Sequence, residues 1–257
     1  MAESPIATRT EHDGAVERIV LNRPKANVLD AAMMGAIREH IGTLADRPGL
    51  RLIVFEGEGP HFCFGASVEE HTKEQAPAML AGFHAMFREI EALSVPTAAV
   101  IRGQCLGGGL ELAAFCSYLI AEEGAQLGQP EIKLAVIAPM ASVLLPCRVG
   151  EGPAQDLLLS GRSVDAEEAF GMGLVNVVAE SGTGEQVLQT WIETEILPKS
   201  PSSLRFAYRT ARLALQRRLA QDLPVIERIY LDELMETHDA NEGIGSFLER
   251  RKPEWEH

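Results

Sequence analysis

The sequence predicts a mixed α/β fold that ends in a purely helical region. Short runs of apolar, β-branched residues alternate with segments of helical periodicity up to about residue 180, and only helical patterns follow. Hydrophobic residues make up 46% of the 257 residues, enough for a substantial core, and no Ser- or Gly-rich linker divides the chain. We therefore expect a core over residues 1–195 and a helical C-terminal region over residues 196–257.

The individual elements follow from local patterns and from residues that begin helices. Runs rich in β-branched residues predict strands at 16–21, 50–55, 97–101, 118–121 and 174–178. Asp30 and Ser200 are expected to cap helix N-termini, and Pro153 is expected to begin a further helix. Residues 61–71 and 126–131 are too short and mixed for regular elements and are expected to form loops. The C-terminal helices are expected at 204–219, 225–235 and 243–251.

Charge and cysteine usage indicate which partners and which compartment to expect. The formal net charge is −14 and the pI is about 5.0, which argues against a nucleic-acid-binding face. The four cysteines lack zinc-like spacing, so we interpret them as reduced thiols. The N-terminus does not resemble a signal peptide, and no apolar stretch is long enough to span a membrane. These features predict a cytoplasmic protein with neither nucleic-acid nor membrane partners.

A glycine-rich turn between a predicted strand and a predicted helix is the first candidate site. The strand at 97–101 is followed by Gly107, Gly108 and Gly109, and Glu111 then lies in the first helical turn. Unpaired N–H groups at such a helix start can bind negative charge. Two interpretations remain open: a functional site, or a flexible joint beside an ordinary first-turn acid. Neither a dinucleotide fingerprint nor a phosphate-binding loop motif is present.

A second acid makes the functional interpretation more specific. Glu131 lies twenty residues after Glu111, with one short predicted strand between them. Paired carboxylates can perform general acid–base chemistry on water. The glycine-rich loops around Gly65 and Gly108 can supply backbone donors for an oxyanion. The sequence has no G-x-S-x-G nucleophile motif and no histidine spacing typical of a metal site, so no metal is expected.

Motifs spread over nearly the whole chain resemble those of the enoyl-CoA hydratase (crotonase) superfamily. They occur in the same order as in that family: LNRPK at 21–25, FCFGA at 62–66, IRGQCLGGGLEL at 101–112, GQPEI at 128–132, LSGR at 159–162, AEEAFGMGLV at 166–175 and GIGSFLERRK at 243–252. The resemblance implies an α/β superhelix of ββα units and a helical C-terminal region that covers the active site and forms trimers, which commonly pair into hexamers.

The resemblance also implies roles for individual residues. Glu111 and Glu131 match the glutamates that position and activate water, and the N–H groups of Ala66 and Gly108 match the oxyanion hole for the thioester oxygen. Coenzyme A contacts are implied by matching positions, namely Lys25, Ala26, Val28, the loop residues Ala66, Ser67, Val68 and Glu69, then Gly108 and Lys252. An acyl-CoA is then the substrate, and neither a metal nor a redox cofactor is implied.

Two segments more closely resemble the cyclohexa-1,5-diene-1-carbonyl-CoA hydratases, FGASVEEH at 64–71 and QPEIKL at 129–134. Two departures from the superfamily pattern concern the acyl pocket: Ser67 replaces the usual aspartate, and residues 135–142 replace a glycine-rich segment with bulkier side chains. Hydration of a cyclic diene is therefore the expected reaction. The alternatives are a general short- or branched-chain enoyl-CoA hydratase and, in a different class, a non-catalytic acyl-CoA- or RNA-binding relative.

Overall fold

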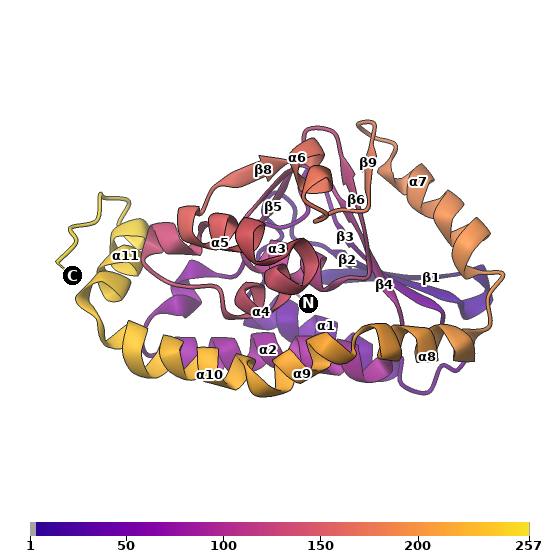
Figure 1. The fold of residues 1–257 in the computed structure, drawn as a ribbon, viewed down its shortest axis with the longest axis horizontal. Helices are drawn as coiled ribbons and strands as arrows, with labels where there is room; N and C mark the ends of the chain where they lie inside the picture. The colour runs from indigo at the N-terminus through magenta and orange to yellow at the C-terminus, as the bar shows by residue number, and fades with distance from the viewer. Residues whose placement is uncertain (1–3, 257) are drawn as a thin grey trace.

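The computed structural model describes residues 4–256, and these form the expected α/β fold, with two β-sheets (Figure 1). The larger sheet has, in spatial order, β1 (Ile6–Glu11), β2 (Val16–Leu21), β3 (Leu52–Gly57), β4 (Thr97–Ile101), β6 (Tyr118–Glu122) and β9 (Val177–Ala179). The smaller sheet has β5 (Gln104–Leu106), β7 (Gln126–Gly128) and β8 (Ser163–Asp165). Strand β1 is antiparallel to β2, and the other strands of the larger sheet pair in parallel.

The chain alternates between the two sheets, and this produces the expected ββα superhelix. After β4 in the larger sheet it forms β5 in the smaller one, and then a helix leads back to β6 beside β4. From β6 it again enters the smaller sheet, as β7 beside β5. Because parallel neighbours need a crossover, each turn carries a helical or looped return segment. The glycine-rich turn and the loop after β7 therefore lie at the same end of adjacent turns.

Helices surround both sheets. The α-helices are α1 (Ala31–Thr43), α2 (Ala76–Leu93), α3 (Gly108–Phe115), α4 (Pro139–Val149), α5 (Glu151–Ser160), α6 (Ala166–Gly171), α7 (Gly184–Trp191), α8 (Pro201–Ala211), α9 (Leu213–Gln221), α10 (Leu223–Arg228) and α11 (His238–Leu248). Short 3-10 helices are η1 (His12–Gly14), η2 (Val68–His71), η3 (Pro130–Leu134) and η6 (Leu234–Glu236), and π-helical turns are η4 (Ile192–Ile196) and η5 (Ile229–Glu233). None in residues 4–256 is long and apolar enough to cross a bilayer.

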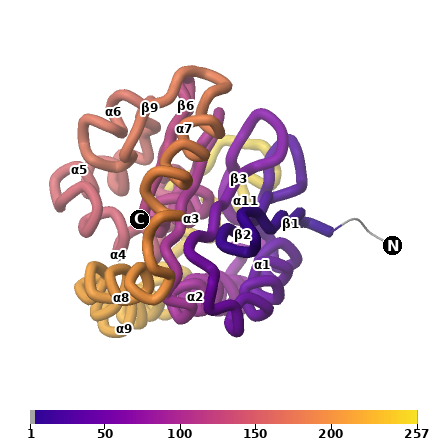
Figure 2. The backbone as a smooth tube through the Cα atoms, turned by 90° about the vertical axis from the view of Figure 1, so that its right-hand side faces the viewer, coloured from indigo at the N-terminus to yellow at the C-terminus, as the bar shows by residue number. Residues whose placement is uncertain are grey.

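The central strands of the larger sheet, β2, β3 and β4, are buried on both faces. Ile19 and Phe55 point toward α1 and α2 and join the main core, which also contains Phe87. Val54, from the opposite face, packs with Leu188 in the layer that α7 provides. Figure 2 shows α7 along one side of the sheet and α1 and α2 along another. Because both faces are covered, β2 and β3 are buried throughout, as continuous apolar runs in parallel sheets usually are.

The C-terminal helices run beside α2 and α4, and then the chain folds back toward the core (Figure 1). Helix α11 packs against η2 and η3. The packing is close, because a Cβ added at Gly243 would lie 2.2 Å from the carbonyl oxygen of Leu134. Part of the apolar surface of this region is not used within the chain: Leu213, Val225 and Ile229 are 54%, 44% and 41% exposed.

The helix-start predictions are confirmed at two positions and wrong at one. Asp30 accepts a hydrogen bond from the amide of Met33, and Ser200 accepts one from the amide of Ser203. The helix expected from Pro153 begins two residues earlier, at Glu151, because Gly150 already provides the turn with a φ of +80°.

Other local predictions are wrong because tertiary contacts decide the structure. The segments expected to be loops contain η2, β7 and η3, and β7 forms only because β5 and β8 lie on its two sides. Strand β1 was not predicted, since all its positions from Ala7 to Thr10 are exposed and give no apolar pattern. Helix α4 was not predicted because Pro139 and Pro146 look like helix breakers in the sequence. The strand expected at 174–178 is β9, which begins at Val177.

Candidate active site

The main cavity has a volume of about 540 Å³ and lies between the core and the C-terminal helices. Loop residues Phe64 to Ala66, the turn Leu106 to Gly108 and the short helix η3 form one side of it. Helix α11 and the adjoining residues Arg251 and Pro253 form the other side. The cavity is therefore built by segments that are distant in sequence, and the superhelix and the returning C-terminal region bring them together.

The two loops predicted to form an oxyanion hole lie against each other. A Cβ added at Gly108 would be 3.1 Å from the amide nitrogen of Ala66, and one at Gly65 would be 3.5 Å from the amide nitrogen of Gly108. Gly65 has a φ of +110°, a conformation that favours glycine. Among residues 4–256, neither the Ala66 nor the Gly108 amide donates a hydrogen bond. Both N–H groups are free for a ligand, and Gly108 is the first residue of α3, so its amide lacks an intrahelical acceptor.

Glu111 lies in the first turn of α3 and is only 4% exposed. Its Oε1 accepts a hydrogen bond of 2.7 Å from the Ala141 amide, in the first turn of α4. Burial, with the nearby charge of Glu131, raises the pKa of Glu111 to about 8, although the Ala141 and Met140 amides act against this shift. The backbone at the start of α4 thus holds the Glu111 carboxylate in place beside the cavity that Glu111 lines.

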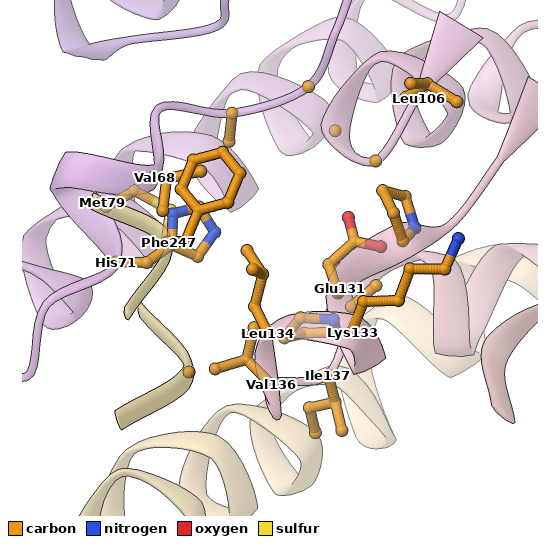
Figure 3. A pocket seen from close by; sticks show the side chains of 18 of the residues that line it. Val68, His71, Met79, Leu106, Glu131, Lys133, Leu134, Val136, Ile137 and Phe247 are labelled. Carbon is orange, nitrogen blue, oxygen red and sulfur yellow. The ribbon is translucent and has the colours of Figure 1, made fainter. Parts of the chain in front are cut away.

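Glu131 lines the cavity from η3, and Figure 3 shows its carboxylate directed toward the side of the cavity that Leu106 lines. Its Oε2 is fully enclosed and has no hydrogen-bond partner among the described residues. Its Oε1 lies against Gly107, where an added Cβ would be only 2.6 Å away. Burial raises the pKa of Glu131 to about 7. An unpaired buried carboxylate with a pKa near neutrality is typical of functional sites.

The rest of the cavity is mainly apolar. Val136, Ile137, Ala138 and Pro139 line one wall, and Figure 3 shows Val136 and Ile137 on the side of the cavity opposite Val68. The sequence predicts that bulky side chains over residues 135–142 form a wall of the acyl pocket. In the structure only residues 136–139 of this segment line the cavity. Ala135 adopts a φ of +54° and does not line the cavity, and Met140 is fully buried in the core.

The predicted coenzyme A contacts divide into two groups. Ala66, Val68 and Gly108 line the cavity. The others lie outside its lining: Lys25, Ala26, Val28, Ser67, Glu69 and Lys252. In this second group the Ser67 hydroxyl donates a 2.8 Å hydrogen bond to Glu69, and Lys25 is exposed with an unusual φ of +152°. Their contact with coenzyme A stays a prediction.

Several cavity residues were not singled out in the sequence as parts of a site. Tyr230 and Phe247 come from the C-terminal helices, and His71, Lys133 and Arg251 also contribute. His71, Lys133, Phe247 and Arg251 lie inside motifs of the family resemblance but were given no role there, and Tyr230 falls in an ordinary helical pattern that gives no signal of a site. Within residues 4–256, no group of three or more His, Cys, Asp or Glu side chains is arranged to hold a metal ion.

These features, a ββα superhelix with two buried glutamates beside paired backbone donors, agree with the comparison to protein families. The chain belongs to the enoyl-CoA hydratase/isomerase family, whose model matches residues 11–257.

Two relatives and one solved structure show more specifically which proteins the chain is similar to. The chain is 48% identical over 255 residues to the cyclohexa-1,5-dienecarbonyl-CoA hydratase of Thauera aromatica, covering 99% of this chain and 98% of the relative. It is 36% identical over 251 residues to a Mycobacterium bovis protein named "Probable enoyl-CoA hydratase", with 96% of each chain covered. Its fold is similar to the crystal structure of an enoyl-CoA hydratase from Mycobacterium avium subsp. paratuberculosis, with a TM-score of 0.86, 24% identity and coverage of 98% and 99%.

Proposed function

We propose that this protein is a hydratase that adds water across a conjugated C=C bond of an unsaturated acyl-CoA thioester. The observation that carries the proposal is the pair of buried carboxylates, Glu111 and Glu131, in the same cavity as the free N–H groups of Ala66 and Gly108. The carboxylates supply proton transfer, and the N–H groups supply a site for a thioester oxygen. Membership of the enoyl-CoA hydratase/isomerase family supports the same reaction.

In the proposed reaction the thioester oxygen binds between the amides of Ala66 and Gly108. Their hydrogen bonds draw electron density from the conjugated alkene, so the carbon β to the carbonyl becomes electrophilic. Negative charge then develops on the thioester oxygen as water attacks. One preorganised donor to such an oxyanion is worth about 10²–10³-fold in rate.

Glu131 is assigned the proton transfer and Glu111 the orientation of water. The enclosed Oε2 of Glu131 has no partner to displace, and a pKa of about 7 suits a group that first accepts and then returns a proton. Water forms the new C–O bond and gives one proton to Glu131, which delivers a proton to the carbon that carries the enolate charge. Glu111 is held by the Ala141 amide and hydrogen-bonds to the same water.

For the acyl group we propose cyclohexa-1,5-diene-1-carbonyl-CoA, as in anaerobic benzoyl-CoA degradation. The support is the 48% identity to the Thauera aromatica enzyme and an apolar wall, Val136 to Pro139, with the 41%-exposed ring of Phe64 also in the lining. A compact ring is held by apolar contact on several sides, whereas a flexible chain is not. Displacement of the reacting carbon by about 1 Å can cost about 10²-fold in rate.

A panel of unsaturated acyl-CoA thioesters tests the substrate. We expect kcat/KM for the cyclic diene to exceed that for crotonyl-CoA by at least about 10²-fold. Equal or faster hydration of crotonyl-CoA would reject the ring and favour the second candidate, a general short- or branched-chain enoyl-CoA hydratase. That candidate is supported by the name of the Mycobacterium bovis relative. Hydration of no thioester at all would favour a non-catalytic acyl-CoA-binding role. The net charge of −14 argues against RNA binding.

We also propose a trimer, alone or paired into a hexamer, without a metal or redox cofactor, that works in the cytoplasm. The exposed apolar side chains of Leu213, Val225 and Ile229 support subunit contacts through the C-terminal helices. Three of the four cysteines are free and buried, which suits a reducing compartment. Light scattering at micromolar concentration tests the assembly, and a stable monomer would refute it.

A further inference from the structure

Tyr230 is a buried cavity residue that has no assigned task in the proposed reaction. It lies in the π-helical turn η5, it is fully buried, and it lines the same cavity as Glu111 and Glu131. Its hydroxyl has no hydrogen-bond partner among the described residues. Burying an unpaired hydroxyl costs stability, so an unpartnered phenol in a residue that lines a cavity needs an explanation. Isolated π-helical turns are frequent at functional sites.

The surroundings of Tyr230 fix its position and keep its proton on the oxygen. Three residues earlier on the same helix, the Glu227 carboxylate pairs with Nδ1 of His84, a fully buried residue of α2. This contact attaches the Tyr230 segment to the core. Burial, followed by the negative charges of Glu131 and Glu111, raises the pKa of the Tyr230 phenol. The hydroxyl is therefore a hydrogen-bond donor over the physiological pH range.

The two unpartnered groups in the cavity are complementary. Tyr230 offers an O–H donor and Glu131 offers the acceptor Oε2, yet they do not bond to each other. A water molecule has two O–H groups and two lone pairs, and buried waters typically make two to four hydrogen bonds. A water between these residues would donate to Glu131 and accept from Tyr230. Its second O–H is left for Glu111, and its second lone pair is left to attack the alkene.

We propose that Tyr230 is a third catalytic residue, whose hydroxyl donates a hydrogen bond to the oxygen of the water that adds to the substrate. This inference rests on the proposed hydratase function. The phenol does not transfer its proton: the water proton goes to Glu131, the new C–O bond forms from the free lone pair, and the Tyr230 hydrogen bond remains on the product hydroxyl. In the reverse reaction the same bond stabilises the departing hydroxide.

The test compares Tyr230→Phe with Tyr208→Phe, using the thioester that the wild-type protein hydrates fastest. Phenylalanine keeps the ring, so both variants should fold. Tyr208 is a matched control because it is also buried, but its hydroxyl bonds to Glu91 and does not line the cavity. Loss of a hydrogen bond to a reacting, partly charged oxygen is expected to lower kcat about 10- to 100-fold for Tyr230→Phe, with KM changed little. Tyr208→Phe should stay within about twofold of wild type.

A binding measurement separates this role from a structural one. The affinities of the hydroxyacyl-CoA product and of its analogue without the hydroxyl are compared by calorimetry. Tyr230→Phe should bind the product about tenfold more weakly and the analogue unchanged, because only the product presents the hydroxyl. Unchanged kcat, or equal losses of affinity for both ligands, would overturn the proposal for Tyr230. A wild-type protein that hydrates no thioester would instead overturn the proposed function.

Discussion

Arg18 and the Glu111–Glu131 pair are both buried charged groups, but their surroundings are opposite. Arg18 lies in the middle of β2, is 1% exposed, and faces the layer that α7 covers. Its guanidinium donates to Glu11, to Glu56 and, in two bonds of 2.6 and 2.7 Å, to Glu185. Burial acts to lower the pKa of Arg18, but these hydrogen bonds and charges raise it above its usual value.

Among residues 4–256, no arginine, lysine or histidine forms an ion pair with either glutamate of the Glu111–Glu131 pair. Glu111 receives backbone N–H donors from the start of α4, and Oε2 of Glu131 has no partner among the described residues. Burial raises the pKa of both groups toward neutrality, and the charge of Glu131 raises the pKa of Glu111 further. A compensated buried charge keeps its ionisation state and holds elements together, whereas an uncompensated pair can exchange protons. The comparison therefore separates a structural cluster from a functional one.

Removal of either glutamate's charge should have the largest effect, and this effect should be a loss of activity with the fold retained. We expect Glu131→Gln and Glu111→Gln to lower kcat by about 10²–10⁴-fold, because each removes a group that handles the reacting water. Circular dichroism and acyl-CoA binding should remain like those of wild type, since glutamine has the same shape. A variant with near wild-type kcat would show that its glutamate has no such role.

Removal of the Arg18 charge should give the opposite result, which is a loss of stability with activity retained. Arg18→Met leaves Glu11, Glu56 and Glu185 close together without their partner, which typically costs about 3–5 kcal/mol of unfolding free energy. Urea titration measures this cost, and kcat per folded molecule should not change.

The matched control is Arg38→Met, which breaks a half-exposed pair with Glu89 and should cost no more than about 1 kcal/mol. Equal losses of stability in the two arginine variants would contradict the distinction between buried and exposed pairs.

The smallest expected effect is a pH dependence of stability that comes from the glutamate pair. The folded-state pKa values, about 8 for Glu111 and about 7 for Glu131, lie above the ordinary value of 4.5. The folded state therefore binds more protons, and stability falls as pH rises from about 4.5 through 8. Each Gln variant should melt a few degrees higher than wild type above pH 8 and about equally at pH 4. Thermal melts at both pH values test this prediction. A gain in melting temperature confined to low pH would contradict the predicted direction of the pH dependence.

Local patterns were sufficient to predict much of the fold and the two acids. The apolar runs of β2, β3 and β4, and the caps at Asp30 and Ser200, depend on neighbours within a few residues, and the structure confirms them. Glu111 in the first turn of α3 is local in the same sense, because the strand, the three glycines and the helix follow one another directly. The family motifs extended this prediction to the ββα superhelix, which the paths of β4 to β7 confirm.

Contacts between distant segments decided the rest. The Ala141 amide that holds Glu111 belongs to α4. This helix was not predicted from the sequence because it contains two prolines. Tyr230 lies in an ordinary helical pattern, and only the return of the C-terminal helices places it in the lining of the cavity with Glu131. Burial is a property of the packed chain, and it is burial that raises the pKa of both glutamates. The sequence alone therefore identified which acids are present, and the tertiary structure determined their protonation and their neighbours.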